Sequence, residues 1–272
     1  MTSAPARAHI NSSRLVRFLT ENALLPAAPA QDHLGQKLGD WLNFRQAIVL
    51  HGILTPETPQ AATTTTTTTS TPAPATKTRR AGLMTAESLA RHVEKVRADL
   101  VHAITHGAPA GSGMARIELP APELDNPVEP KTAFEPYRRF YAAHQRQMEN
   151  SLRLLRAQVR TQLSKSTPAL QQLATLDAAF EQILSEREAV LLGKVSKLHE
   201  KRFAQALKLH LKQQAEAALA DTPQTTHNGN PSAWLMPLRQ ALRTSLLAEL
   251  DTRLQPTLGL LEAFTQENPK EK

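Results

Sequence analysis

The chain of 272 residues contains no cysteine, which excludes disulfide bonds, thiolate metal sites and cysteine nucleophiles and leaves the redox compartment undefined. Aromatic residues make up only 4% of the chain, there are only ten glycines, and alanine and leucine supply most of the apolar side chains. This composition favours helices over sheets. The nineteen prolines cluster and leave long proline-free runs. We therefore predict an all-α fold, with long helices in an extended bundle or coiled coil and disordered Thr/Pro-rich linkers.

Long apolar runs are also missing. Nowhere do about 18 apolar residues follow one another, so we expect no integral membrane segment. Charged residues interrupt the apolar run within residues 1–26, which argues against a secretory signal. We therefore expect a cytoplasmic protein. The net charge of +7 is compatible with a polyanionic partner, although basic solubility explains it as well.

Composition shifts divide the chain into five segments. These are an N-terminal helical pair at 1–54, a disordered linker at 55–82, a helix at 83–106, a Pro/Gly-rich linker at 107–133 and a long-helix bundle at 134–267. The first linker holds seven consecutive threonines framed by proline and alanine. A segment with so little to bury cannot offset the entropy lost on ordering it.

Capping residues and apolar spacing define the expected helices. The N-terminal pair is predicted as one helix from Ser12 or Ser13 to Pro26 and a second over residues 34–54. Thr85 is expected to cap the helix that ends at residue 106. Its apolar seam has the narrow spacing that suits a second helix.

The C-terminal half is dominated by helical periodicity. One boundary is expected at STPAL, residues 166–170, where Pro168 suits the first position of a helix that could extend to residue 222. That length is typical of coiled coils. Another helix is expected to end near residue 254, with Pro256 starting a short last helix.

Four arginines recur at intervals of seven on the helix expected over residues 134–166 and lie opposite its apolar seam, drifting only ~20° per heptad. They are Arg139, Arg146, Arg153 and Arg160. We predict that they form an outward surface for a polyanion or an acidic protein. A solvated or intramolecularly paired face is the alternative. In a nucleic-acid complex, nearby aromatic side chains could stack on bases.

Other candidate chemistry lacks companion residues. His102 and His106 have the spacing of two metal ligands on a helix, but a third ligand and the glutamate of a metalloprotease motif are missing. GAPAGSGMAR has no Lys-Ser/Thr ending of a phosphate-binding loop, and there is no GxSxG motif. We therefore assign no catalytic, cofactor-binding or metal-binding residue and expect neither a cofactor nor an enzyme.

Four stretches resemble an uncharacterised proteobacterial family known only as a domain of unknown function. They are SSRLVRFL at 12–19, LGDWLNFRQAIVL at 38–50, YRRFYAAHQRQMENSLRLLRAQVR at 137–160 and STPALQQLATLDAAFEQILSEREAVLLGKV at 166–195. The resemblance implies a soluble helical protein without an assigned activity. Members of this family are often encoded near envelope proteins that resemble proton-channel stators and peptidoglycan-binding outer-membrane proteins. The resemblance therefore implies a cytoplasmic accessory to an envelope complex.

The function expected from these observations is that of a non-enzymatic cytoplasmic interaction or scaffold protein. A seam this long needs a partner helix, so we expect a protein partner or self-association, unless the C-terminal helix folds back onto it. The alternative is a nucleic-acid-binding protein that uses the arginine stripe.

Overall fold

The computed structural model describes residues 13–22, 24, 34–55, 84–121, 129, 132–219 and 233–268. These ranges contain helices and connecting segments and no strand, which confirms the all-α prediction. Within them, no helix has the length and apolar character needed to cross a membrane. The linker expected at 55–82 lies outside the described residues except for Thr55, as does part of the linker at 107–133. A coiled-coil geometry stays a prediction.

Three helices are described in the N-terminal segment, where two were expected. They are α1 (Arg14–Glu21), α2 (Leu34–Trp41) and α3 (Phe44–Leu54). The single helix predicted over residues 34–54 is wrong because Asn43 caps a new helix. Its side chain accepts a hydrogen bond of 2.9 Å from the Gln46 amide, and the Gln46 side chain accepts one of 3.0 Å from the Asn43 amide.

The next three helices begin within two residues of the predicted positions, and the end predicted for the third at residue 222 lies outside the described residues. They are α4 (Ala86–His106), α5 (Glu135–Ser164) and α6 (Pro168–Leu219). Thr85 caps α4, since its hydroxyl accepts a hydrogen bond of 3.2 Å from the Ser88 amide. Pro168 is the first residue of α6, where the missing N–H costs nothing.

The last helix continues through a position where the sequence predicted a break. A short 3-10 turn, η2 (Ala233–Leu235), leads into α7 (Met236–Glu267), and Pro256 lies inside this helix. The separate last helix expected from Pro256 is therefore wrong. A proline removes one hydrogen bond from the helix, and the turns on both sides gain enough burial to continue, as Leu254 and Leu260 show.

The chain separates into two compact units, and α4 to α7 each contribute residues to both. The first unit consists of Met1–Gln31, Val96–Leu152 and Glu188–Leu254, and the second of Asp32–Lys95, Arg153–Arg187 and Gln255–Lys272. Neither unit is one continuous stretch of chain. Each unit has its own core.

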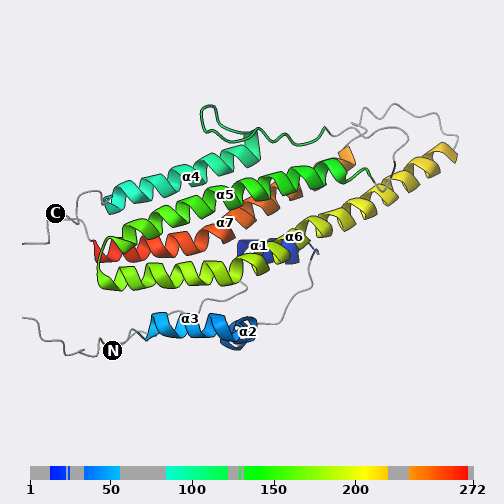
Figure 1. Ribbon diagram of the computed structural model, residues 1–272. Helices are drawn as coiled ribbons and strands as arrows, with labels where there is room; N and C mark the ends of the chain where they lie inside the picture. Colours follow the sequence, from blue (N-terminus) through cyan, green and yellow to red (C-terminus); the bar gives the residue numbers. More distant parts are fainter. Residues whose placement is uncertain are drawn as a thin grey trace, which may run out of the picture. The chain divides into compact units, whose positions relative to one another are not determined.

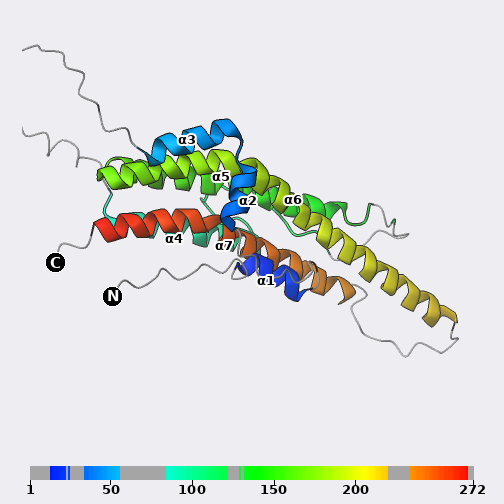
Figure 2. The same cartoon turned by 90° about the horizontal axis from the view of Figure 1, so that it is seen from below.

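The first unit is a helical bundle with an aromatic cluster at one end. Phe203 of α6 contacts the rings of Phe134, Tyr137 and Trp234 at centroid distances of 5.4, 6.1 and 5.8 Å. The α1 helix lies against α6 and α7 (Figures 1 and 2), where Arg14 forms an ion pair of 2.6 Å with Asp251. Four of the aromatic residues thus gather where three segments of the first unit meet.

The C-terminal end of α6 extends past the other helices of the first unit. Figures 1 and 2 both show this end beyond the start of α7. Every residue from 211 to 216 is exposed, and so is Leu209. These turns of α6 are therefore helical without tertiary burial.

The second unit packs α3 along the N-terminal part of α6 (Figures 1 and 2). Gln172 of α6 donates a hydrogen bond of 2.9 Å to the carbonyl of Ile53, at the end of α3. The Arg187 guanidinium lies 5.5 Å from the Trp41 ring centroid and donates a hydrogen bond of 3.0 Å to the Trp41 carbonyl. The buried side chains of this unit include Leu50, Leu89, Leu155, Val159, Leu163, Leu170 and Phe264.

Candidate functional site

Two of the four predicted stripe arginines lie in the first unit, and both are exposed. Arg139 Nε donates a hydrogen bond of 3.1 Å to Glu135 one turn earlier, so part of its charge is compensated on the same helix. Arg146 projects from the next turns of the same face. Their use as a binding surface stays a prediction.

The other two stripe arginines lie in the second unit and differ from each other. Arg153 is exposed. The Arg160 side chain is only 17% exposed and forms ion pairs of 3.0 Å with Asp177 and 2.5 Å with Glu181 of α6. The outward position predicted for Arg160 is therefore wrong. A drift of ~20° per heptad amounts to about 60° over three heptads, which turns the last arginine of the stripe toward α6.

The two histidines with metal-ligand spacing are bonded locally. His102 Nδ1 lies 2.9 Å from the Gly107 carbonyl oxygen, and His106 Nδ1 lies 2.7 Å from the Thr105 hydroxyl. Their ring centroids are 5.1 Å apart. Across the described part of the chain, no group of three or more His, Cys, Asp or Glu side chains is placed to hold a metal ion.

A buried carboxylate in the interior of the first unit was not predicted from the sequence. Glu249 of α7 has no exposed surface and accepts hydrogen bonds from the Tyr141 hydroxyl (3.0 Å) and from Gln145 Nε2 (3.0 and 3.1 Å). Arg253 forms an ion pair of 3.0 Å with it one turn later on α7 and reaches Glu188 of α6 at 3.1 Å. Three helices are thus joined through one charged network.

Burial controls the protonation of this network. It raises the pKa of Glu249, while the Arg253 charge and the donated hydrogen bonds act in the opposite direction. Burial and the neighbouring Glu249 charge raise the pKa of Tyr141 well above its ordinary value. The phenol therefore keeps its proton and donates a hydrogen bond to the carboxylate.

A second buried pair lies beside this network. His199 Nε2 is 2.7 Å from the Ser245 hydroxyl, and both side chains have no exposed surface. Burial, followed by the Arg202 charge, lowers the pKa of His199 to about 4. In a Ser-His-Asp triad a carboxylate orients the other ring nitrogen. His199 Nδ1 is buried without a hydrogen-bond partner among the described residues, so the orienting group of such a triad is missing here.

Sequence spacing contained a signal for these buried polar groups. Leu242, Leu246, Glu249 and Arg253 follow one another at steps of four, three and four residues on α7, so the charged pair occupies the buried stripe. Polar residues at stripe positions indicate interior contacts. Their partners could not be named, because they lie on α5 and α6, far away in the sequence.

The second unit exposes large apolar side chains on α3. Only Leu50 of this helix is buried, and on the opposite face Phe44 and Ile48 are 83% and 55% exposed. Val49, about 100° further around the helix, is 50% exposed. We call Phe44 and Ile48 the α3 apolar face. Apolar groups that are contiguous and open to water mark interaction surfaces.

These features define an all-helical protein with a polar interior network in one unit and an open apolar helix face in the other. A family model matches residues 1–266, and the chain belongs to that family, described as "Protein of unknown function (DUF3348)". Comparisons with curated proteins and with solved structures found no match.

Proposed function

We propose that this protein is a non-enzymatic interaction protein that binds a partner helix on the α3 apolar face. The observation that carries the proposal is the exposure of Phe44 and Ile48 on one face of α3. Burial of each such side chain by a partner would contribute roughly 1.5–3 kcal/mol of favourable transfer free energy. The spacing of four residues is the pattern with which a helix contacts another helix.

The contacts of α3 support this assignment. Leu50 and the Ile53 carbonyl hold α3 within the second unit, so the apolar face is presented from a helix whose opposite side is already packed. The capping box at Asn43 fixes the start of the helix one residue before Phe44. A partner would therefore meet a preformed surface, which reduces the entropy lost on binding.

The partner is an amphipathic helix, either from a second copy of this chain or from another protein. The cytoplasmic location and the accessory role in an envelope complex are part of the same proposal. Identification of the bound protein would decide between these arrangements.

A photo-crosslinking residue placed at Ile48 in the full chain tests the proposal in living cells. We expect a crosslinked product whose mass distinguishes a second copy from another protein, and its loss in the Phe44→Asp variant. The control position is Glu87, an exposed residue of the same unit. If Ile48 gives no more product than Glu87, the α3 apolar face is not an interaction surface. Because Phe44 is so exposed, its substitution should change the free energy of unfolding by no more than ~0.5 kcal/mol.

A further inference from the structure

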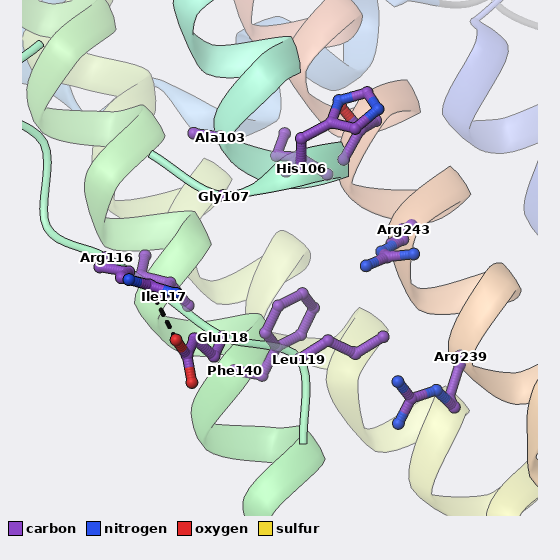
Figure 3. A pocket seen from close by; sticks show the side chains of 12 residues that line it. Ala103, His106, Gly107, Arg116, Ile117, Glu118, Leu119, Phe140, Arg239 and Arg243 are labelled. Carbon is purple, nitrogen blue, oxygen red and sulfur yellow. Dashed lines mark hydrogen bonds and ion pairs between the residues drawn. The ribbon is translucent and has the colours of Figure 1, made fainter. Parts of the chain in front are cut away.

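A cavity of about 200 Å³ lies in the first unit. The end of α4, the segment around residues 116–119, α5 and α7 line it, and it is open to solvent on one side (Figure 3). Its apolar lining comes from Ile104, Ile117, Leu119 and Phe140. Gly107 follows the last residue of α4 and lines the cavity. Its φ of +97° is a backbone conformation that residues with a Cβ rarely adopt. The glycine thus directs the chain from α4 toward the cavity wall.

The charged lining of the cavity is mostly positive. It comprises three guanidinium groups and one carboxylate, from Arg116, Arg239, Arg243 and Glu118. Arg116 and Glu118 pair with each other at 2.8 Å, and both are largely exposed. The remaining two arginines come from neighbouring turns of α7, with their guanidinium groups on the side of Phe140 (Figure 3). No carboxylate of the lining pairs with them.

The two α7 arginines differ in how they are bonded. Arg239 donates a hydrogen bond to the Pro120 carbonyl, which fastens the segment before α5 to α7. Arg243 has a buried Nε without a hydrogen-bond partner among the described residues. A buried N–H donor left unbonded costs free energy, and it costs more when the group is charged. The Arg243 charge also reaches His144, which is buried and holds an unpartnered Nε2.

We propose that this cavity binds the oxyanion of a small organic acid, a carboxylate or phosphate, with the anionic group on Arg243 and the apolar body against Phe140 and Leu119. A guanidinium group matches two oxygens of such an anion in one plane, and the terminal Nη groups of Arg243, which lines the cavity, would make this contact because its Nε is buried. Arg239 adds positive charge at the same cavity, whereas the Arg116 charge is compensated by Glu118. This inference is independent of the α3 apolar face, which lies in the other unit.

Titration calorimetry of the full chain with phenyl phosphate and with benzoate, at constant ionic strength, tests the inference. We expect saturable binding of at least one probe by the wild-type protein, and binding weaker by roughly tenfold or more in Arg243→Gln. Lys194→Gln removes an exposed cation of α6 in the same unit and should leave the affinity unchanged. Inorganic phosphate should bind more weakly than phenyl phosphate, because it has no apolar body.

Three results would overturn the inference. They are no saturable binding of either organic probe at millimolar concentration, equal affinity in the wild type and Arg243→Gln, or equal loss in Lys194→Gln. Arg243→Lys keeps the positive charge and replaces the planar group by a compact ammonium, so it serves if the glutamine variant does not fold. We expect Arg243→Lys to bind the probes several-fold more weakly than the wild type, and an unchanged affinity would count against the planar contact.

Discussion

The Tyr141 hydroxyl donates a hydrogen bond of 3.0 Å to Glu249 Oε2, and neither side chain has any exposed surface. The two residues are separated by 108 positions in the sequence. Their contact joins α5 to α7 in the interior of the first unit. A buried carboxylate is costly unless its oxygens are bonded, so this hydrogen bond should matter for stability.

We expect Tyr141→Phe to lower the free energy of unfolding by about 1–3 kcal/mol, because Glu249 loses one of its donors. Urea unfolding of the two proteins measures this difference. Tyr137→Phe is the comparison, since the Tyr137 hydroxyl donates to the Ala121 carbonyl at 3.2 Å and interacts with Arg239 but contacts no buried carboxylate. That substitution should cost less, about 1 kcal/mol, because it leaves no buried carboxylate without a donor. Equal losses in the two variants would show that the carboxylate contact has no special weight.

Arg253→Met should destabilise the protein by roughly 3–5 kcal/mol, because it leaves Glu249 buried without its ion-pair partner. Arg14→Met breaks a more exposed ion pair with Asp251 in the same unit and should cost at most about 1 kcal/mol. In the double variant Glu249→Gln/Arg253→Met the buried charge is gone. We expect thermal unfolding of this double variant at a higher temperature than for Arg253→Met, and a lower temperature would contradict the ion-pair argument.

The stability of the protein should fall as the pH decreases from about 6.5 toward 4. The pKa of His199 is about 4 in the folded protein, against 6.5 as its ordinary value, so the unfolded state binds a proton first over this window. The same direction holds for His144. Glu249 acts with the opposite sign, because its raised pKa favours the folded state at low pH. Two histidines act in one direction and one carboxylate in the other, so we expect a net loss of stability of the folded protein.

His199→Gln tests the histidine contribution, since glutamine can keep the bond to Ser245 but does not titrate. We expect the loss of stability between pH 7 and pH 5 to be smaller by about 2 kcal/mol in this variant than in the wild type. Urea unfolding at both pH values measures it. His51→Gln, at an exposed position of α3, should follow the wild type. Parallel curves for the wild type and His199→Gln would refute the assignment.

Arg160 and Arg153 provide a matched pair within one predicted stripe. Arg160→Gln should lower the free energy of unfolding by about 1–3 kcal/mol, because Glu181 loses its ion pair with Arg160 and Asp177 keeps only Arg156. Arg153→Gln should stay within ~0.5 kcal/mol of the wild type because Arg153 is exposed. Urea unfolding decides this as well. A larger loss for Arg153 would mean that its exposed position is misassigned.

The nucleic-acid alternative can be tested on the exposed arginines. If Arg139, Arg146 and Arg153 each contact a phosphate of a duplex, the logarithm of the affinity should fall with the logarithm of the salt concentration with a slope near −2.7, or about −0.9 per contact. Replacing all three by Gln should remove this slope. Fluorescence anisotropy with a labelled duplex measures both. Absence of binding at low salt, or an unchanged slope in the triple variant, would exclude this alternative.

The helix boundaries could be predicted where a local signal sets them. Thr85 and Pro168 act within one turn of their own position, so the sequence around them contained all the information needed. The same reasoning failed at Asn43, a capping residue inside an apolar pattern, and at Pro256, where burial on both sides outweighs one lost hydrogen bond. The local preference of a residue for starting or ending a helix sets the boundary only where tertiary contacts do not outweigh it.

The polar interior could not be predicted, because it depends on which helix faces meet. Glu249 lies on an apolar stripe, but the sequence does not show that Tyr141 and Gln145 face it. Arg160 was placed outward by heptad spacing alone, and only the position of α6 reveals its acidic partners. The exposure of an apolar helix face could not be predicted either, because the apolar residues of α3 have the spacing expected for burial.

The last described turns of α6 have consequences for how the chain can vary and be handled. Residues 212–216 are exposed, so no packing requirement selects their side chains. Any residue with good helix propensity should serve there, and sequence drift should be fast unless a bound molecule restrains it. The same turns offer an attachment point for a fluorophore or a spin label, because a probe there would report on binding without disturbing either core.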